Sequence, residues 1–253
     1  MKQDSYLSSY TPMEWTDAKV SRFWDFTSHF PTHYFTYLLG EGILNFIRSR
    51  IKTYNRILDY GSGTGHFLND LLRLGGEVQA LEFSPVSLSK INAAFKGREN
   101  FLGSILFDEV KNYQDTFDFI TCIEVVEHLS DEHLAQTFAN ILSLLKPGGL
   151  CMITTPNDEE LSQNLVYCPH CNHYFHRWQH MRSWSKESLA SYAESKGFKV
   201  KEVLETNFAN YIPSRHKGLK KLLKSILTPL RSYMDNRSSK EKNVHLVCII
   251  EKQ

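Results

Sequence analysis

From residue 55 onward, short apolar runs alternate with stretches in which apolar positions recur at helical spacing. The apolar runs read RILDY, VQALEF, FLGSIL, FDFITCIEVV, LCMITTP, FKVKEVLE and HLVCIIEK. The helical stretches between them lie near residues 65–74, 85–95, 131–145 and 185–196. Strands separated by about 10 to 15 helical residues indicate parallel βαβ units with right-handed crossovers. The pattern therefore predicts an α/β fold with a doubly wound, Rossmann-like sheet.

Residues 1–55 depart from this alternation because aromatic side chains are frequent among them. Helical spacing is clear at Ile43, Phe46, Ile47 and Ile51. We expect an N-terminal helical extension over residues 1–55 that covers the active site of a larger unit, residues 56–253. Its aromatic side chains are expected to make core contacts, and a lid role is the alternative.

Two later segments also interrupt the alternation, and each is too long for an ordinary connection. The first, at about 157–183, is rich in cysteine and histidine, and the second, at about 211–243, is basic and amphipathic. We expect both to be functional insertions.

Composition narrows the class of protein. The 253 residues are 42% hydrophobic and 23% charged, which is typical of a soluble globular protein. No apolar run approaches the ~18 residues of a membrane span, and the N-terminus lacks an apolar segment of the secretory type. Of the 5 cysteines, 3 lie inside apolar runs, which favours a reducing compartment over a disulfide framework. We therefore expect a cytoplasmic protein.

The net charge of +1 argues against a general nucleic-acid binder, but the charge is unevenly distributed. Residues 214–240 carry a local charge of +7, which leaves −6 on the remaining chain. Within 216–234, leucines recur at helical spacing and lysines take the other face. The segment is expected to be a surface helix on the core. Peripheral contact with an anionic membrane and an RNA phosphate contact are the alternatives.

A glycine-rich loop, ILDYGSGTGHFL, follows the first strand and places Gly61, Gly63 and Gly65 at the start of a helix. Such a loop lets the backbone approach a ligand and directs free N–H groups towards it. A dinucleotide fingerprint would require a third glycine at position 66, which is His66 here. This departure argues against an NAD-linked oxidoreductase.

An acidic residue, Glu82, ends the next strand, 17 residues beyond Gly65. A carboxylate at the tip of this strand can accept hydrogen bonds from the hydroxyl groups of a ribose. The loop and the carboxylate together predict a nucleoside-containing ligand.

These features resemble the class I S-adenosylmethionine (SAM) dependent methyltransferases, which carry comparable motifs in the same order. The resemblance runs from about Arg56 to Gln253 and includes FDFITCIEVVEHL and LKPGGLCMITTPN. It implies a seven-stranded sheet whose last strand, residues 245–251, is antiparallel and lies beside the fifth. The SAM contacts that it implies are Asp59, Gly61, Ser62, Gly63, Gly65, Glu82, Phe83, Cys122 and Ile123.

The motif Glu124-Val125-Val126-Glu127-His128 follows the fourth strand of this unit, where the reacting groups should meet. Two carboxylates and an imidazole can bind a hard cation, while a role in orienting the loop is the alternative. The motif is similar to that of small-RNA 2′-O-methyltransferases and ubiquinone-pathway O-methyltransferases. This resemblance implies Mg²⁺ or Mn²⁺ bound by Glu124, Glu127, His128 and His180, with the first three as catalytic candidates.

The insertion CPHCNHYFHRWQH contains Cys168 and Cys171, followed by His173 and His176. These four side chains are candidate ligands for a structural Zn²⁺. A substrate-recognition loop without a metal, and ligands shared with the Glu124 motif, are the alternatives.

Taken together, the residues predict a SAM-dependent methyltransferase that acts on a hydroxyl oxygen of a small-molecule or lipid-like acceptor. An RNA 2′-hydroxyl is the alternative acceptor, and nucleic acid is the less favoured partner. A zinc-bearing binding module with a degenerate cofactor pocket is the alternative of another class.

Overall fold

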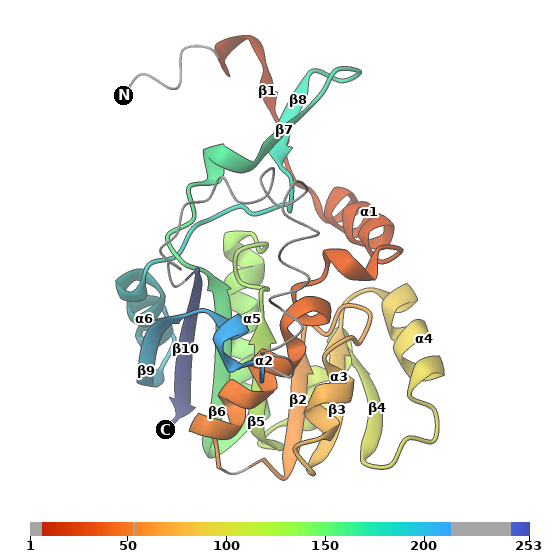
Figure 1. Cartoon of the computed structure of the whole chain (residues 1–253), viewed down its shortest axis with the longest axis vertical. Coiled ribbons are helices and arrows are strands. Elements are labelled where there is room, and N and C mark those ends of the chain that lie inside the picture. Colours follow the sequence, from red (N-terminus) through yellow and green to blue (C-terminus); the bar gives the residue numbers. More distant parts are fainter. Residues whose placement is uncertain (1–6, 53, 214–243) are drawn as a thin grey trace, which may run out of the picture.

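A seven-stranded sheet forms the centre of the protein (Figure 1). The computed structural model describes residues 7–52, 54–213 and 244–253. The strands of this sheet are β2 (Arg56–Tyr60), β3 (Glu77–Glu82), β4 (Phe101–Leu106), β5 (Phe117–Ile123), β6 (Leu145–Pro156), β9 (Phe198–Thr206) and β10 (His245–Lys252). Their order is β4-β3-β2-β5-β6-β10-β9, and β10 runs antiparallel to both neighbours. This confirms the doubly wound, Rossmann-like sheet and its antiparallel last strand beside β6.

Helices cover both faces of this sheet. They are α2 (Phe35–Arg50), α3 (Leu68–Leu72), α4 (Pro85–Ala94), α5 (Asp131–Leu144) and α6 (Lys186–Ser195). Helix α1 (Asp17–Thr27) lies beyond the carboxyl ends of the parallel strands (Figure 1). Short 3-10 turns are η1 (Leu7–Ser9), η2 (Pro31–His33), η3 (Phe107–Tyr113), η4 (Leu161–Asn164) and η5 (Phe208–Tyr211). Helix α3 begins three residues after the predicted start, because Gly65 has φ of +83°, a left-handed conformation that a helix does not accommodate.

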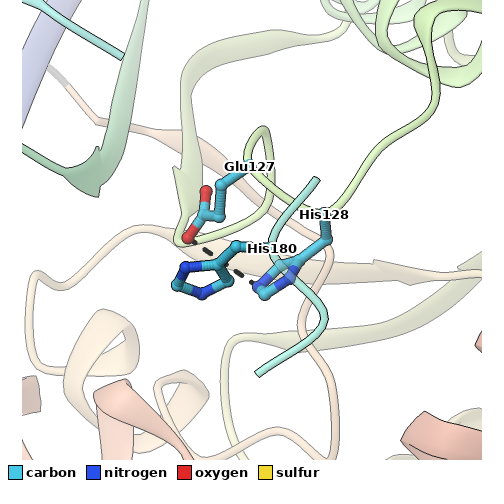
Figure 2. Close-up of side chains that lie close together, drawn as sticks. All are labelled: Glu127, His128 and His180. Atoms are coloured by element: carbon cyan, nitrogen blue, oxygen red, sulfur yellow. Dashed lines mark ion pairs between the residues drawn. The ribbon is translucent and has the colours of Figure 1, made fainter. Parts of the chain in front are cut away.

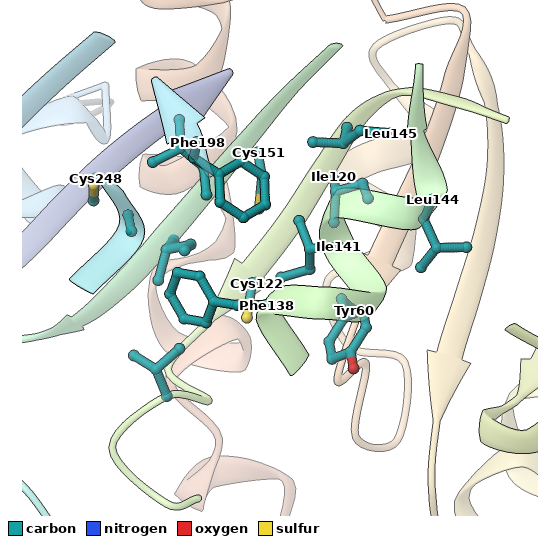
Figure 3. Packing of buried hydrophobic residues seen from close by; sticks show 14 of the residues in the cluster. Tyr60, Ile120, Cys122, Phe138, Ile141, Leu144, Leu145, Cys151, Phe198 and Cys248 are labelled. Atoms are coloured by element: carbon teal, nitrogen blue, oxygen red, sulfur yellow. The ribbon is translucent and has the colours of Figure 1, made fainter. Parts of the chain in front are cut away.

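Two apolar clusters, one on each face, hold the helices to the sheet. Helices α5 and α6 contribute Phe138, Ile141 and Leu189 to one cluster, part of which is drawn in Figure 3. Helix α2 contributes Phe46 and Ile47 to the other, together with side chains of α3 and α4. Because side chains of a strand alternate between faces, neighbouring residues of β5 join opposite clusters.

A second, three-stranded sheet lies beyond the carboxyl ends of the parallel strands (Figure 1). The hairpin of β7 (Leu165–Cys168) and β8 (His173–His176) lies within the expected insertion at 157–183, and β1 (Thr11–Pro12) pairs with β8 in parallel. The N-terminal extension is therefore not entirely helical, since its first residues complete a sheet with the insertion.

The predicted basic amphipathic segment, 216–234, lies outside the described residues. Among the residues that the structure does describe, no helix has the length and apolar character needed to cross a membrane.

Candidate functional site

A cavity of about 2080 Å³ opens at the carboxyl ends of β2, β3, β5 and β6. Its floor is formed by the glycine loop and the strand ends, and its wall includes Trp15, Trp24 and Tyr34 from the N-terminal region. Residues from the loops after β5 and β6 complete the other side. The cavity thus joins the predicted cofactor residues, the Glu-His motif and the N-terminal aromatic residues, which line it as a lid would.

The glycine loop is held by short backbone contacts to the neighbouring strand. Gly61 N–H donates to the Leu81 carbonyl at 2.9 Å, and the Ser62 hydroxyl donates to the same oxygen at 3.1 Å. Gly63 has φ of +55°, and a Cβ atom there would lie 2.8 Å from Cε1 of Tyr34. Only glycine combines this conformation with such a close approach.

Glu82 lies at the tip of β3 and is only 5% exposed. Its Oε1 accepts the N–H groups of Phe83 and Ser84 at 2.9 and 3.1 Å, and its Oε2 accepts Gly63 N–H at 2.8 Å. A carboxylate has about four acceptor positions, so Oε2 can accept one more hydrogen bond. Burial raises the pKa of Glu82 to about 7, although these three hydrogen bonds oppose the rise.

Asp59, at the end of β2, is the second buried carboxylate on this side of the cavity. Its Oδ1 accepts a hydrogen bond from the Thr121 hydroxyl at 2.8 Å. Burial raises the pKa of Asp59 to about 7, and this hydrogen bond lowers it only in part. Both acids could therefore exchange a proton near neutral pH when a cationic ligand binds.

Two of the predicted cofactor residues do not line the cavity, while Ile123 and Phe83 do. Cys122 is completely buried in the cluster beneath α5, because strand alternation directs it away from Ile123. Gly65 faces Ile91 and Leu68, so its role is to let the start of α3 pack closely on α4. Phe83 is 49% exposed at the rim.

The Glu-His motif begins directly after β5 with a sharp change of direction. Glu124 has φ of +52°, which is unusual for a residue other than glycine. The Thr154 hydroxyl donates to its Oε1 at 2.8 Å, and burial raises the pKa of this carboxyl. Glu124 lines the cavity, but it is held by β6 and does not join the metal-ligand cluster described next. Glu124, predicted to bind the same ion as Glu127, therefore lies apart from the other three predicted ligands in this structure.

Glu127, His128 and His180 converge on one point of the cavity (Figure 2). One potential ligand atom from each lies within 4.8 Å of the others. Glu127 is 1% exposed, and neither carboxylate oxygen has a hydrogen-bond partner among the described residues. Its Oε1 lies 3.7 Å from Nε2 of His128. A buried carboxylate without donors requires a cation, a proton or a polar ligand, because burying a bare charge is costly.

The electrostatics of this cluster suit metal binding. Burial, together with the neighbouring charge of Glu124, raises the pKa of Glu127 well above its ordinary value. Burial lowers the pKa of His128 to about 3, so that its imidazole is neutral near pH 7. A neutral imidazole is the form that binds a metal.

Contacts between two loops bring His180 to this cluster, 52 residues after its neighbour in sequence. Met181 N–H donates to the Glu127 carbonyl at 2.8 Å, and Gln179 Nε2 donates to the His128 carbonyl at 2.9 Å. The Gln179 side chain also accepts from the Trp24 indole at 3.0 Å. Helix α1, the loop after β8 and the Glu-His motif are thereby linked in one network.

Glu159, in the loop after β6, is a site residue that sequence reasoning missed. Its carboxylate contacts His176 and His180, and one ligand atom from each of the three lies within 4.8 Å of the others. No motif marks Glu159, which is one of several acids in the segment NDEEL. Only the folded chain places it behind His180.

The predicted zinc quartet is not assembled. His173 and His176 are three residues apart in β8, so they point to opposite faces of the strand. His176 is buried near Glu159, whereas Cys171 is exposed at the hairpin turn and its carbonyl accepts a hydrogen bond from His173 at 2.7 Å. The structure therefore does not bring together Cys168, Cys171, His173 and His176, the four residues predicted to bind one Zn²⁺.

A family described as a methyltransferase domain matches residues 32–203 of the chain, more than half of its length. The chain belongs to the class I SAM-dependent methyltransferases. The match begins at residue 32, so it includes α2 as well as the central sheet.

Known proteins resemble the chain in sequence and in fold. It is 28% identical over 150 residues to the ubiquinone biosynthesis O-methyltransferase of Colwellia psychrerythraea, covering 54% of this chain and 60% of that protein. The Aeromonas salmonicida enzyme of the same name is 29% identical over 145 residues, with 56% and 59% covered. The chain therefore spans about 60% of the length of these relatives.

Among solved structures, the 1,6-didemethyltoxoflavin-N1-methyltransferase of Burkholderia thailandensis superposes with a TM-score of 0.61 at 14% identity. The superposition covers 96% of this chain and 95% of that one. At this identity the likeness concerns the fold alone.

Proposed function

We propose that the chain transfers the methyl group of SAM to a hydroxyl oxygen of a small-molecule acceptor, assisted by a divalent cation. The observation that carries this proposal is the buried Glu127 carboxylate, which lacks hydrogen-bond donors and lies beside two imidazoles in the same cavity as the glycine loop. The names of the ubiquinone O-methyltransferase relatives support a hydroxyl acceptor.

The cofactor half of the cavity fits SAM. Gly61, Ser62 and Gly63 line the cavity, and the free acceptor position on Glu82 suits a ribose hydroxyl. Asp59 contributes a buried carboxylate that favours the cationic methionine part of SAM. The main task of these residues is to hold the methyl donor in line with the acceptor.

The acceptor half fits a hard divalent cation. Glu127 would supply an anionic oxygen, and His128 and His180 would each supply an imidazole nitrogen. A bound Mg²⁺ or Mn²⁺ would supply Lewis acidity that lowers the pKa of an acceptor hydroxyl. Trp24 and the aromatic residues around it exclude water from the acceptor side.

The proposal is tested with methyl-labelled SAM in a metabolite extract, followed by mass identification of the labelled product. A labelled hydroxyl of a small molecule, formed with Mn²⁺ and lost with EDTA, is the expected result. Labelled RNA would contradict the small-molecule acceptor. Methyl transfer that EDTA does not affect would contradict the role of the cation. SAM binding is measured separately by calorimetry and should persist in EDTA, because the cation contacts the acceptor and not SAM.

A further inference from the structure

A second group of polar side chains lies directly behind His180. Glu159 Oε2 accepts a hydrogen bond from Nδ1 of His180, while its Oε1 accepts from Asn164 Nδ2 at 3.1 Å and lies 3.3 Å from Nε2 of His176. The Glu159 side chain is 15% exposed. Its carboxylate is thus anchored from three directions in a largely dry environment.

Hydrogen bonds assign the proton on His176. Its Nδ1 accepts the backbone N–H groups of His180 and Trp178 at 3.2 and 3.4 Å, so the proton resides on Nε2, the nitrogen that faces Glu159. A protonated nitrogen cannot bind a metal. Glu159, His176 and His180 are therefore interpreted as a group that positions His180, although their atoms lie close enough for a metal centre.

The same reasoning assigns the proton on His180. With Nδ1 donating to Glu159, its Nε2 keeps a free lone pair. The His180 ring is stacked on His176 at 4.3 Å with 22° between the planes, and it lies 4.8 Å from the His128 ring. Contact on one side and a hydrogen bond on the other leave this ring little freedom to turn.

We infer that Glu159 is a positioning residue, whose carboxylate fixes the tautomer and orientation of His180 so that Nε2 faces Glu127 and His128. The inference rests on the metal centre of the proposed function. A carboxylate bonded to a metal-binding histidine orients the ring and increases its basicity, and loss of such a partner costs roughly 10- to 100-fold in metal affinity.

The test is a Mn²⁺ titration of the metal-free full chain, followed by calorimetry and electron paramagnetic resonance. We expect Glu159→Ala to weaken Mn²⁺ binding by roughly 100-fold and Glu159→Gln, which can still accept one hydrogen bond, by roughly 10-fold. Glu160→Gln is the matched control, because Glu160 is the exposed neighbour and its carboxylate, among the described residues, accepts hydrogen bonds from Ser162 and from neither histidine. Its Mn²⁺ affinity should equal that of the wild type. SAM affinity should be unchanged in all three variants, which shows that they are folded.

The tautomer is measured independently by ¹⁵N NMR of histidine-labelled, metal-free protein. A proton on Nδ1 of His180 in the wild type, lost from that position in Glu159→Ala, supports the inference. A proton on Nε2 in the wild type overturns it. So does equal Mn²⁺ affinity of wild type and Glu159→Ala, or a second ion per chain that Glu159→Ala removes. A wild type that binds SAM but no Mn²⁺ would instead refute the metal centre itself, and the inference with it.

Discussion

Each half of the cavity contains a buried carboxylate, Glu82 in the cofactor half and Glu127 in the acceptor half. The two carboxylates differ in the hydrogen bonds that they accept. Glu82 accepts three backbone hydrogen bonds from its own loop and from the glycine loop, whereas Glu127 accepts none from the described residues. The hydrogen bonds of Glu82 are therefore largely satisfied without a ligand, whereas Glu127 is a buried carboxyl group without hydrogen-bond donors among the described residues. Uncompensated buried groups of this kind are typical of functional sites.

The largest expected effect is on the cofactor half. Gly63→Arg should abolish SAM binding, a loss of more than about 1000-fold or ~4 kcal/mol, because its φ of +55° disfavours a side chain and the new one would displace Tyr34 in the wall of the cavity. Gly75→Arg is the control, since Gly75 has φ of +88° but nothing within 4 Å of a Cβ atom. It carries the same backbone strain without occupying the cavity. Calorimetry with SAM compares the two, and equal affinities would mean that the loop does not hold SAM.

In the acceptor half, we expect one substitution to lower activity and to raise stability. Glu127→Gln should reduce methyl transfer and Mn²⁺ binding by at least about 100-fold, more than the loss of a residue that only orients a ligand. In the absence of metal it should raise the melting temperature by about 2–4 °C per kcal/mol gained, because the folded protein no longer has to bury a carboxyl group whose pKa is raised above its value in the unfolded chain. Glu132→Gln, at an exposed position of α5, serves as the control. A lower melting temperature would show that Glu127 is satisfied in the free protein.

Acid should weaken SAM binding. Burial raises the pKa of Asp59 and Glu82 to about 7 in the folded protein, from ordinary values of 3.8 and 4.5. SAM affinity should therefore fall roughly tenfold per pH unit below 7 for each of these groups that must be ionised. Calorimetry across this range is the measurement, and Glu82→Gln should show a shallower dependence. A flat profile in the wild type would contradict the assignment.

The stability of the SAM-free protein should depend on pH in the opposite sense. Because the folded state binds these two protons more tightly than the unfolded state, their contribution to the free energy of unfolding decreases as the pH rises towards 7. Glu82→Gln should consequently gain melting temperature relative to the wild type between about pH 5 and pH 8. A constant difference across that range would indicate that the carboxyl is not perturbed.

The smallest effect is expected far from both halves, at the hairpin turn. Cys168→Ser/Cys171→Ser should change the free energy of unfolding by no more than about 0.5 kcal/mol, because the turn is largely exposed and the four-ligand zinc site is not assembled. Thermal unfolding and elemental analysis check this. Zinc found in the wild type and absent from the double variant would show that Cys168 and Cys171 bind zinc after all.

The residues of the cofactor half could be predicted from the sequence because they lie at the ends of consecutive strands. Gly61, Gly63 and Gly65 follow one strand, and Glu82 ends the next, so the βαβ order alone brings them to the same edge of the sheet. The alternation of apolar runs likewise predicted every strand of the main sheet. Cys122 was misassigned to the cavity because the motif does not show which face of β5 each residue takes.

The acceptor half required the tertiary structure. Sequence similarity indicated Glu127, His128 and His180, but only the folded chain separates Glu124 from them and supplies Glu159. It also pairs the N-terminal strand β1 with the insertion, a contact between segments about 160 residues apart. Sequence patterns report what repeats along a strand or helix, whereas loops that meet through single hydrogen bonds leave no periodic signal. The glycine loop and Glu82 thus come together through the local order of strands and helices. Glu127, His128 and His180 come together only through the packing of distant loops.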